Sequence, residues 1–156
     1  AVELSKKGQD TFGKLEACPM PVLADDSGIA VRALGGRPGV YSARYGEASS
    51  DRPLTDPEKN ELLLSEMRDV VDRSAYYVCS MTLVLSETRF VQAQETWEGA
   101  LATAPSDGTN GFGYDPIFLL PERGVTVADI DPEEKNRISH RGKAARIIEG
   151  ALTELA

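Results

Sequence analysis

The clearest pattern in the sequence is the alternation of apolar residues between positions 75 and 86. The apolar residues of one face are Tyr77, Cys79, Met81, Leu83 and Leu85. The other face of this segment is also largely apolar, which predicts a central β-strand covered on each side. Residues 90–100 follow after a turn near Glu87-Thr88, so we predict a partner strand and a long antiparallel hairpin.

Three segments carry apolar residues at helical spacing. The first covers residues 1–17. The second begins at Thr55, which forms a capping box with Glu58, and extends to about residue 70. The third begins after a cap at Ser139 and runs from His140 to the end of the sequence. Its predicted buried stripe consists of Ala144, Ile147, Ile148, Ala151, Leu152 and Leu155.

Shorter apolar runs predict further strands. Residues 22–24 and 29–34 predict two of them, and the Ser27-Gly28 step between them predicts a tight turn at the mouth of a sheet. Residues 116–120 and 125–128 predict two more short strands. Strand-like and helix-like segments alternate without internal repeats, so we predict one α/β domain with a mixed sheet.

Composition and charge narrow the classes of function. The chain has 156 residues, of which 41% are hydrophobic and 27% charged, as in a globular domain with a sizeable core. Its net charge of −8 argues against binding to nucleic acid or to a membrane surface. No apolar run approaches the roughly 20 residues of a membrane span, and no signal peptide opens the sequence. Cys18 and Cys79 lack metal-ligand spacing, so we expect reduced thiols in a cytoplasmic protein.

Two adjacent carboxylates, Asp25 and Asp26, follow the apolar run that ends at Ala24. Acidic side chains beside a core are costly unless they are paired, hydrogen-bonded or metal-bound. One interpretation is a site for a hard cation such as Mg²⁺, which prefers carboxylate oxygen. The other is a turn in which the aspartates accept hydrogen bonds from their own backbone. These residues alone do not decide between the two.

A glycine-rich and polar stretch over residues 104–115 predicts a functional loop. Gly111 and Gly113 flank Phe112 and would let a ligand approach the backbone closely. The Phe112 ring offers a face for stacking on a planar base, and Asp115 offers a hydrogen-bond acceptor beside it. The alternative interpretation is a glycine-rich turn with aromatic residues that belong to the core.

Basic residues surround the single histidine of the chain, between Lys135 and Lys143. His140 and Arg141 stand in the first turn of the predicted last helix, where free backbone amides attract anions. The alternative is a solvated basic turn. Together with the carboxylate pair and the aromatic platform, this segment favours a nucleoside triphosphate as the ligand. Glycine-rich dinucleotide and phosphate loops of the familiar patterns are absent from the sequence, and no serine nucleophile setting is recognisable.

Three motifs stand in order along the chain: residues 23–28 with 33–45, residues 112–116, and residues 139–144. They resemble the signatures of the inosine triphosphate pyrophosphatase family over nearly the whole sequence. The resemblance implies an elongated, two-lobed α/β fold in which helices flank a central mixed sheet. It also implies a homodimeric, Mg²⁺-dependent enzyme that hydrolyses ITP, dITP and XTP to the monophosphate and pyrophosphate. Such an enzyme removes deaminated purines from the nucleotide pool.

The resemblance also implies roles for single residues. Asp26 is implied to bind the metal and to accept the proton of the attacking water, with Asp25 in support. The implied substrate contacts are Ser27, Phe112, Gly113, Tyr114, Asp115, Lys135, His140 and Arg141. Selection against adenine would come from donors that face the purine O6, because an amino group there would leave them unpaired. We expect Asp26, the Phe112 ring and the cationic start of the final helix to converge on one hollow.

The family pattern contains further elements ahead of its first helix: a strand, a Thr/Ser-x-Asn-x-x-Lys phosphate loop and a Glu-Asn pair. The sequence shows none of them. We therefore expect a single domain over residues 1–156 without the N-terminal strand and phosphate-binding loop, and little or no turnover in a protein that starts at Ala1. Two other functions stay open. One is a pyrophosphatase for other modified nucleotides, such as methylated pyrimidine triphosphates, and the other is a non-catalytic nucleotide-binding or assembly module.

Overall fold

The structure, a computed structural model, describes residues 21–86 and 88–155. The helix predicted over residues 1–17 and the predicted thiol of Cys18 lie outside the described residues. Within them, Cys79 is a free and buried cysteine, as expected. No helix in the described part of the chain is both long enough and apolar enough to cross a membrane.

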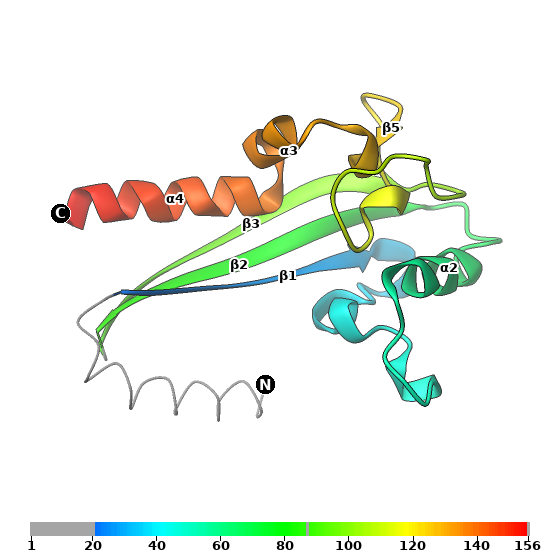
Figure 1. Cartoon of the computed structure of the whole chain (residues 1–156), viewed down its shortest axis with the longest axis horizontal. Coiled ribbons are helices and arrows are strands. Elements are labelled where there is room, and N and C mark those ends of the chain that lie inside the picture. Colours follow the sequence, from blue (N-terminus) through cyan, green and yellow to red (C-terminus); the bar gives the residue numbers. More distant parts are fainter. Residues whose placement is uncertain (1–20, 87, 156) are drawn as a thin grey trace.

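A single five-stranded sheet organises the described residues, and its strands follow one another in chain order. The strands are β1 (Val22–Val31), β2 (Ser74–Ser86), β3 (Arg89–Leu101), β4 (Phe118–Leu120) and β5 (Val125–Thr126). The first three are long and give the molecule its elongated outline (Figure 1). The predicted hairpin is confirmed, because β2 and β3 pair antiparallel with Tyr77 opposite Trp97.

The α/β class is as expected, but the described sheet is not mixed. Each of its four neighbouring strand pairs is antiparallel. The physical reason is the connectivity. Each strand lies beside its predecessor and runs back along it, whereas a parallel neighbour needs a crossover to the same end of the sheet.

The tight turn predicted at Ser27-Gly28 is wrong, because β1 runs through both residues without interruption. Gly28 has no positive φ and serves packing instead. A Cβ at this position would lie 2.4 Å from the carbonyl oxygen of Gly39 and 2.8 Å from Ser42 Oγ. Both residues belong to the 3₁₀ helix η2 (Gly39–Arg44), which packs against β1. Glycine is therefore needed here for close approach between two segments.

The described residues form three α-helices beside the sheet: α2 (Asp56–Glu66), α3 (Pro132–Ile138) and α4 (His140–Leu155). The predicted capping box is present, since Glu58 Oε2 accepts from the Thr55 backbone N–H at 2.8 Å. The helix ends at Glu66, four residues earlier than predicted. Helix α3 was not predicted. Its cap is Asp131, whose carboxylate accepts from Glu133 N–H at 2.8 Å.

The core consists of two clusters on the sheet. The larger one packs α2 and the segments around β4 against the sheet, with Phe118, Leu63 and Ile29 fully buried. The smaller one lies where α4 crosses β2 and β3, with Ala144 and Ile148 buried (Figure 1).

Two expectations about burial need correction. Strand β2 is buried on the face that carries Tyr77 and Met81, while its other face is only half-buried in the described structure. In α4, Ile147 and Leu152 are 46% and 40% exposed, so the predicted stripe is buried only in part. Within the described residues only Ala144 and Ile148 of this stripe are buried, and the side chain of Leu155 lies outside the described part.

Candidate functional site

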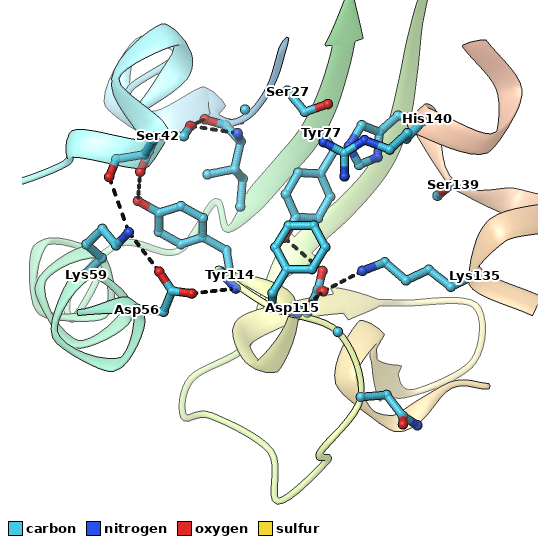
Figure 2. Close-up of a pocket in the computed structure, with 18 of the residues that line it drawn as sticks. Ser27, Ser42, Asp56, Lys59, Tyr77, Tyr114, Asp115, Lys135, Ser139 and His140 are labelled. Atoms are coloured by element: carbon cyan, nitrogen blue, oxygen red, sulfur yellow. Dashed lines mark hydrogen bonds and ion pairs between the residues drawn. The ribbon is translucent and has the colours of Figure 1, made fainter. Parts of the chain in front are cut away.

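A cavity of about 420 Å³ opens between η2, α2, the loop before β4, and the start of α4 (Figure 2). All eight residues predicted as substrate contacts line it. They are Ser27, Phe112, Gly113, Tyr114, Asp115, Lys135, His140 and Arg141. Residues from four separate parts of the sequence thus face one space. Their contact with a substrate stays a prediction.

Asp26 does not line this cavity. Side chains alternate along a strand, so Asp26 lies on the opposite face of β1 from Asp25 and Ser27. The expected convergence on one hollow therefore holds for Phe112 and the start of α4 but not for Asp26. The two aspartates are adjacent in the sequence, which had suggested a shared site. In a strand, however, the side chains of neighbouring residues point to opposite faces.

The two carboxylates of β1 differ in their partners. Asp25 Oδ2 accepts from Arg141 Nε at 2.7 Å, which joins β1 to the first turn of α4. Asp26 is exposed and forms no ion pair within the described residues. The described residues contain no group of three acidic, histidine or cysteine side chains that could hold a metal ion. A metal ion at Asp26 would thus find at most one further acidic, histidine or cysteine ligand within the described residues.

The floor of the cavity is built on Asp115, which is 3% exposed. Its carboxylate accepts from the Phe112 backbone N–H at 2.8 Å, from Tyr77 Oη at 3.2 Å and from Lys135 Nζ at 2.5 Å. Burial, followed by the neighbouring Asp115 charge, raises the pKa of Tyr77, which keeps its hydroxyl a donor. The carboxylate expected to accept from a ligand is therefore already engaged, and it anchors the loop that carries Phe112.

Phe112 is the exposed aromatic surface of the cavity, with 65% of the residue accessible. The ammonium of Lys135 lies 4.7 Å from its ring centroid, and the guanidinium carbon of Arg141 lies 5.7 Å from it. Gly111 and Gly113 on each side have φ of 80° and 61°, which other residues adopt at a cost. The core interpretation of this turn is therefore wrong for Phe112, whose ring is an open surface close to two cations.

His140 lies behind this platform as a neutral imidazole. It is 6% exposed and stacks on the Tyr77 ring with centroids 4.7 Å apart. Burial first, and then the positive charges of Arg141, Lys135 and Lys143, lower the pKa of His140 to about 3. Its Nδ1 has no hydrogen-bond partner within the described residues. A neutral ring can offer one donor and one acceptor nitrogen to a ligand.

The predicted cap of the last helix is confirmed, because Ser139 Oγ accepts from the Gly142 N–H at 3.1 Å. The cap fixes the backbone on which His140 and Arg141 stand. Burial on one side and the ion pair to Asp25 on the other then turn these two adjacent side chains in different directions.

Comparison with known proteins decides the family. The Ham1 family profile matches residues 4–150 of the chain. The chain belongs to the Ham1 family. It is 48% identical to the dITP/XTP pyrophosphatase of Treponema denticola over 84% of this chain and 69% of that protein. Identity to the enzyme of the same description from Nitrosomonas europaea is 47%, over 85% of this chain and 64% of the relative.

Solved structures of the family share the fold. A HAM1 protein from Coxiella burnetii superposes with a TM-score of 0.79 at 42% identity, over 88% of this chain and 69% of that one. The Ham1 protein of Staphylococcus aureus gives a TM-score of 0.79 at 37% identity, over 92% of this chain and 72% of that one. The present chain thus spans about two thirds of the length of these relatives.

Several residues that line the cavity were not predicted from the sequence. Tyr77 was placed only in a strand, and its hydroxyl contact with Asp115 depends on long-range packing. Asp56 and Lys59 line the cavity from the first turn of α2. The capping box that starts α2 was the one available signal, because it positions that first turn. Nothing in the local sequence indicates that the turn faces the loop around Gly113.

Proposed function

We propose that this protein hydrolyses the non-standard purine nucleoside triphosphates ITP, dITP and XTP to the monophosphate and pyrophosphate. The observation that carries the proposal is the exposed Phe112 ring close to the Lys135 and Arg141 cations, on the wall of the cavity that all eight predicted substrate contacts line. The dITP/XTP pyrophosphatases that match the chain support the same substrate class.

The cavity suits a keto purine. A planar base stacked on Phe112 would place its edge near the N–H donors of Lys135 and Arg141 and near the neutral ring of His140. The Asp115 carboxylate, a strong acceptor, is occupied by protein donors. The remaining groups are therefore rich in donors, which match the carbonyl oxygens of hypoxanthine and xanthine. The amino group of adenine would leave such donors unpaired, which can discriminate strongly.

Hydrolysis requires water to attack the α-phosphorus while the bond to pyrophosphate breaks. On the family resemblance we assign the acceptance of the water proton to Asp26, an exposed carboxylate that lies next to Ser27 on β1 but on the opposite face of the strand, outside the cavity lining. Mg²⁺ bound by Asp26 would offset charge on the triphosphate, and one carboxylate with waters and phosphate oxygens is its usual protein environment. Arg141, held by Asp25, and Lys135 add positive charge on the cavity side.

The test is pyrophosphate release by the full-length protein from ITP, dITP, XTP, ATP and GTP in the presence of Mg²⁺. The wild type should act on the first three far faster than on ATP, and Asp26→Asn should lose turnover while it still binds ITP in calorimetry. Equal rates for ITP and ATP would refute the substrate class. Full activity of Asp26→Asn would refute its role.

The same experiment separates the alternatives. Binding of ITP without hydrolysis by the full-length protein indicates a nucleotide-binding or assembly module. A preference for methylated pyrimidine triphosphates in an extended substrate panel indicates the other pyrophosphatase activity. A chelator that leaves turnover intact would refute the requirement for Mg²⁺.

The homodimer and the cytoplasmic location belong to this proposal as well. Both come from the family resemblance and stay predictions. Analytical ultracentrifugation of the full-length protein tests the first, since a species at the mass of one chain would refute it. Fractionation of cells that express the protein tests the second.

A further inference from the structure

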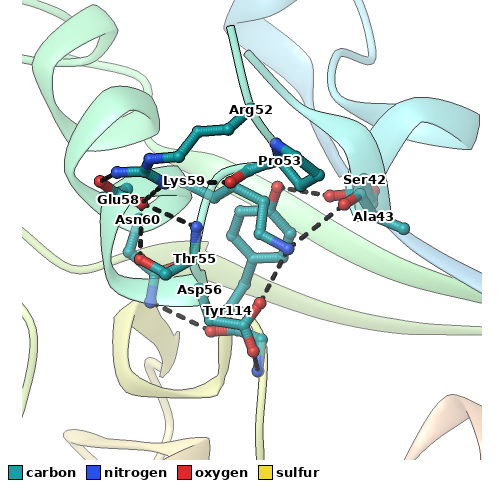
Figure 3. Close-up of polar contacts among 11 residues, drawn as sticks. Ser42, Ala43, Arg52, Pro53, Thr55, Asp56, Glu58, Lys59, Asn60 and Tyr114 are labelled. Carbon is teal, nitrogen blue, oxygen red and sulfur yellow. Dashed lines mark hydrogen bonds and ion pairs between the residues drawn. The ribbon is translucent and has the colours of Figure 1, made fainter. Parts of the chain in front are cut away.

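The backbone of Gly113 is held at both of its polar groups by side chains of α2 (Figure 3). Asp56 Oδ2 accepts from the Gly113 N–H at 3.0 Å, and Asn60 Nδ2 donates to the Gly113 carbonyl oxygen at 3.0 Å. Positions four apart lie on the same face of a helix, so both side chains reach the same residue. We call Asp56 and Asn60 the Gly113 clamp.

Lys59 locks the clamp from the other side. Its ammonium lies 2.8 Å from Asp56 Oδ1 and donates to the Ala43 carbonyl oxygen at 3.3 Å. The side chain of Lys59 is 11% exposed, so this charge depends on its partners. The hydrogen bond with Lys59, and in smaller part the one from Gly113, lowers the pKa of Asp56. The carboxylate is thus fixed between α2, η2 and the loop.

The clamp acts on the residue next to Phe112. Phe112 is exposed, so packing does not fix its ring, and the glycine on each side gives the backbone unusual freedom. Its own N–H is held by Asp115, and the Gly113 clamp holds the following peptide. Tyr114 beyond it is anchored through a 2.8 Å hydrogen bond to the Ser42 carbonyl oxygen.

We propose that Asp56 and Asn60 are positioning residues for the base, which hold Phe112 in its stacking position before the substrate arrives. This inference rests on the proposed function, because it assigns a role in binding of the purine. Without the clamp, substrate binding would have to order the loop that carries Phe112. That ordering costs free energy, so the affinity for the purine nucleotide would fall. The proton transfer that we assign to Asp26 on β1 would be unaffected.

The experiment measures KM and kcat for ITP in the full-length protein with Asp56→Ala and Asn60→Ala. Each substitution removes one hydrogen bond to Gly113 and should raise KM about tenfold. The kcat should stay within about twofold, because interactions made equally before and during the reaction change KM alone. Asp56→Asn keeps an amide oxygen that can accept from Gly113, so it should restore most of the affinity lost in Asp56→Ala.

Glu58→Gln is the matched control. Glu58 lies in the same helical turn, and its carboxylate is bound to Arg52 and the Thr55 N–H, away from the loop. It should lower the melting temperature without a change in KM. If loss of α2 stability were the cause, Glu58→Gln would raise KM like the clamp variants.

Unchanged KM in Asn60→Ala overturns the inference, and so does a failure of Asp56→Asn to restore affinity. If Asp56→Ala does not fold, Asn60→Ala decides alone. A wild type that releases no pyrophosphate from ITP refutes the proposed function and the clamp with it. An active wild type with unaffected clamp variants refutes the clamp only.

Discussion

The buried histidine allows one sharp test of the structure through the pH dependence of stability. His140 is the one histidine of the chain, and its pKa is lowered from 6.5 to about 3 in the fold. Between pH 6.5 and about pH 3, His140 is protonated in the unfolded chain but neutral in the folded protein. Stability from the neutral ring is therefore fully present above pH 6.5 and is lost as pH falls toward 3.

The magnitude follows from the pKa difference. Each pH unit below 6.5 removes about 1.36 kcal/mol, so a fall from neutral pH to about pH 5 costs roughly 2 kcal/mol. The carboxylates with lowered pKa values, such as Asp56 and Asp129, are still ionised in both states over most of this range. Between about pH 7.5 and pH 5, the pH dependence of the unfolding free energy thus reports mainly on His140.

The assay is urea unfolding of the wild type and His140→Gln at several pH values across this window. His140→Gln should be less stable at neutral pH, because it loses the stacking on Tyr77, but its unfolding free energy should be nearly independent of pH. The wild type should lose roughly 2 kcal/mol more than the variant between the two ends. If the unfolding free energies of the wild type and His140→Gln changed in parallel with pH, the neutral, buried state of His140 would be refuted. An imidazole NMR signal that titrates near pH 6.5 would refute it as well.

Three further substitutions test the site and its support. Phe112→Ala should change the free energy of unfolding by less than about 0.5 kcal/mol, yet raise KM for ITP at least about fivefold through lost stacking, in steady-state assays of pyrophosphate release. Lys135→Met should destabilise the fold by about 3 kcal/mol in urea unfolding, because it leaves the Asp115 carboxylate buried without its cation. Gly28→Ala should cost about 1–3 kcal/mol in thermal unfolding, because its Cβ would meet the Gly39 carbonyl oxygen at 2.4 Å.

Each of these has a matched control. Phe112→Tyr keeps the ring and should bind ITP like the wild type. Lys135→Arg keeps the positive charge and should recover part of the lost stability. Gly150→Ala lies in α4 with open space around its Cβ and should stabilise by up to roughly 1 kcal/mol. An unchanged KM in Phe112→Ala would contradict base stacking on this ring. Wild-type stability in Lys135→Met would contradict the ion pair with Asp115, and wild-type stability in Gly28→Ala would contradict the close approach to Gly39.

Local patterns predicted the long hairpin and the starts of two helices, but neither helix α3 nor the uninterrupted course of β1. The alternation over β2 and β3 predicted the hairpin, and the caps at Thr55 and Ser139 predicted the starts of two helices. These signals are local, because strand periodicity and helix capping depend on residues a few positions apart. The family resemblance likewise named eight residues that the fold brings to one cavity.

Tertiary structure alone decided how those residues face one another. The strand that runs through Ser27 and Gly28 sends Asp25 and Asp26 to opposite faces, whereas their adjacency in the sequence had suggested one shared cation site. The pKa of His140 depends on burial against Tyr77, a residue 63 positions away along the chain. Such properties arise from contacts between distant segments, and the composition of either segment alone does not specify them.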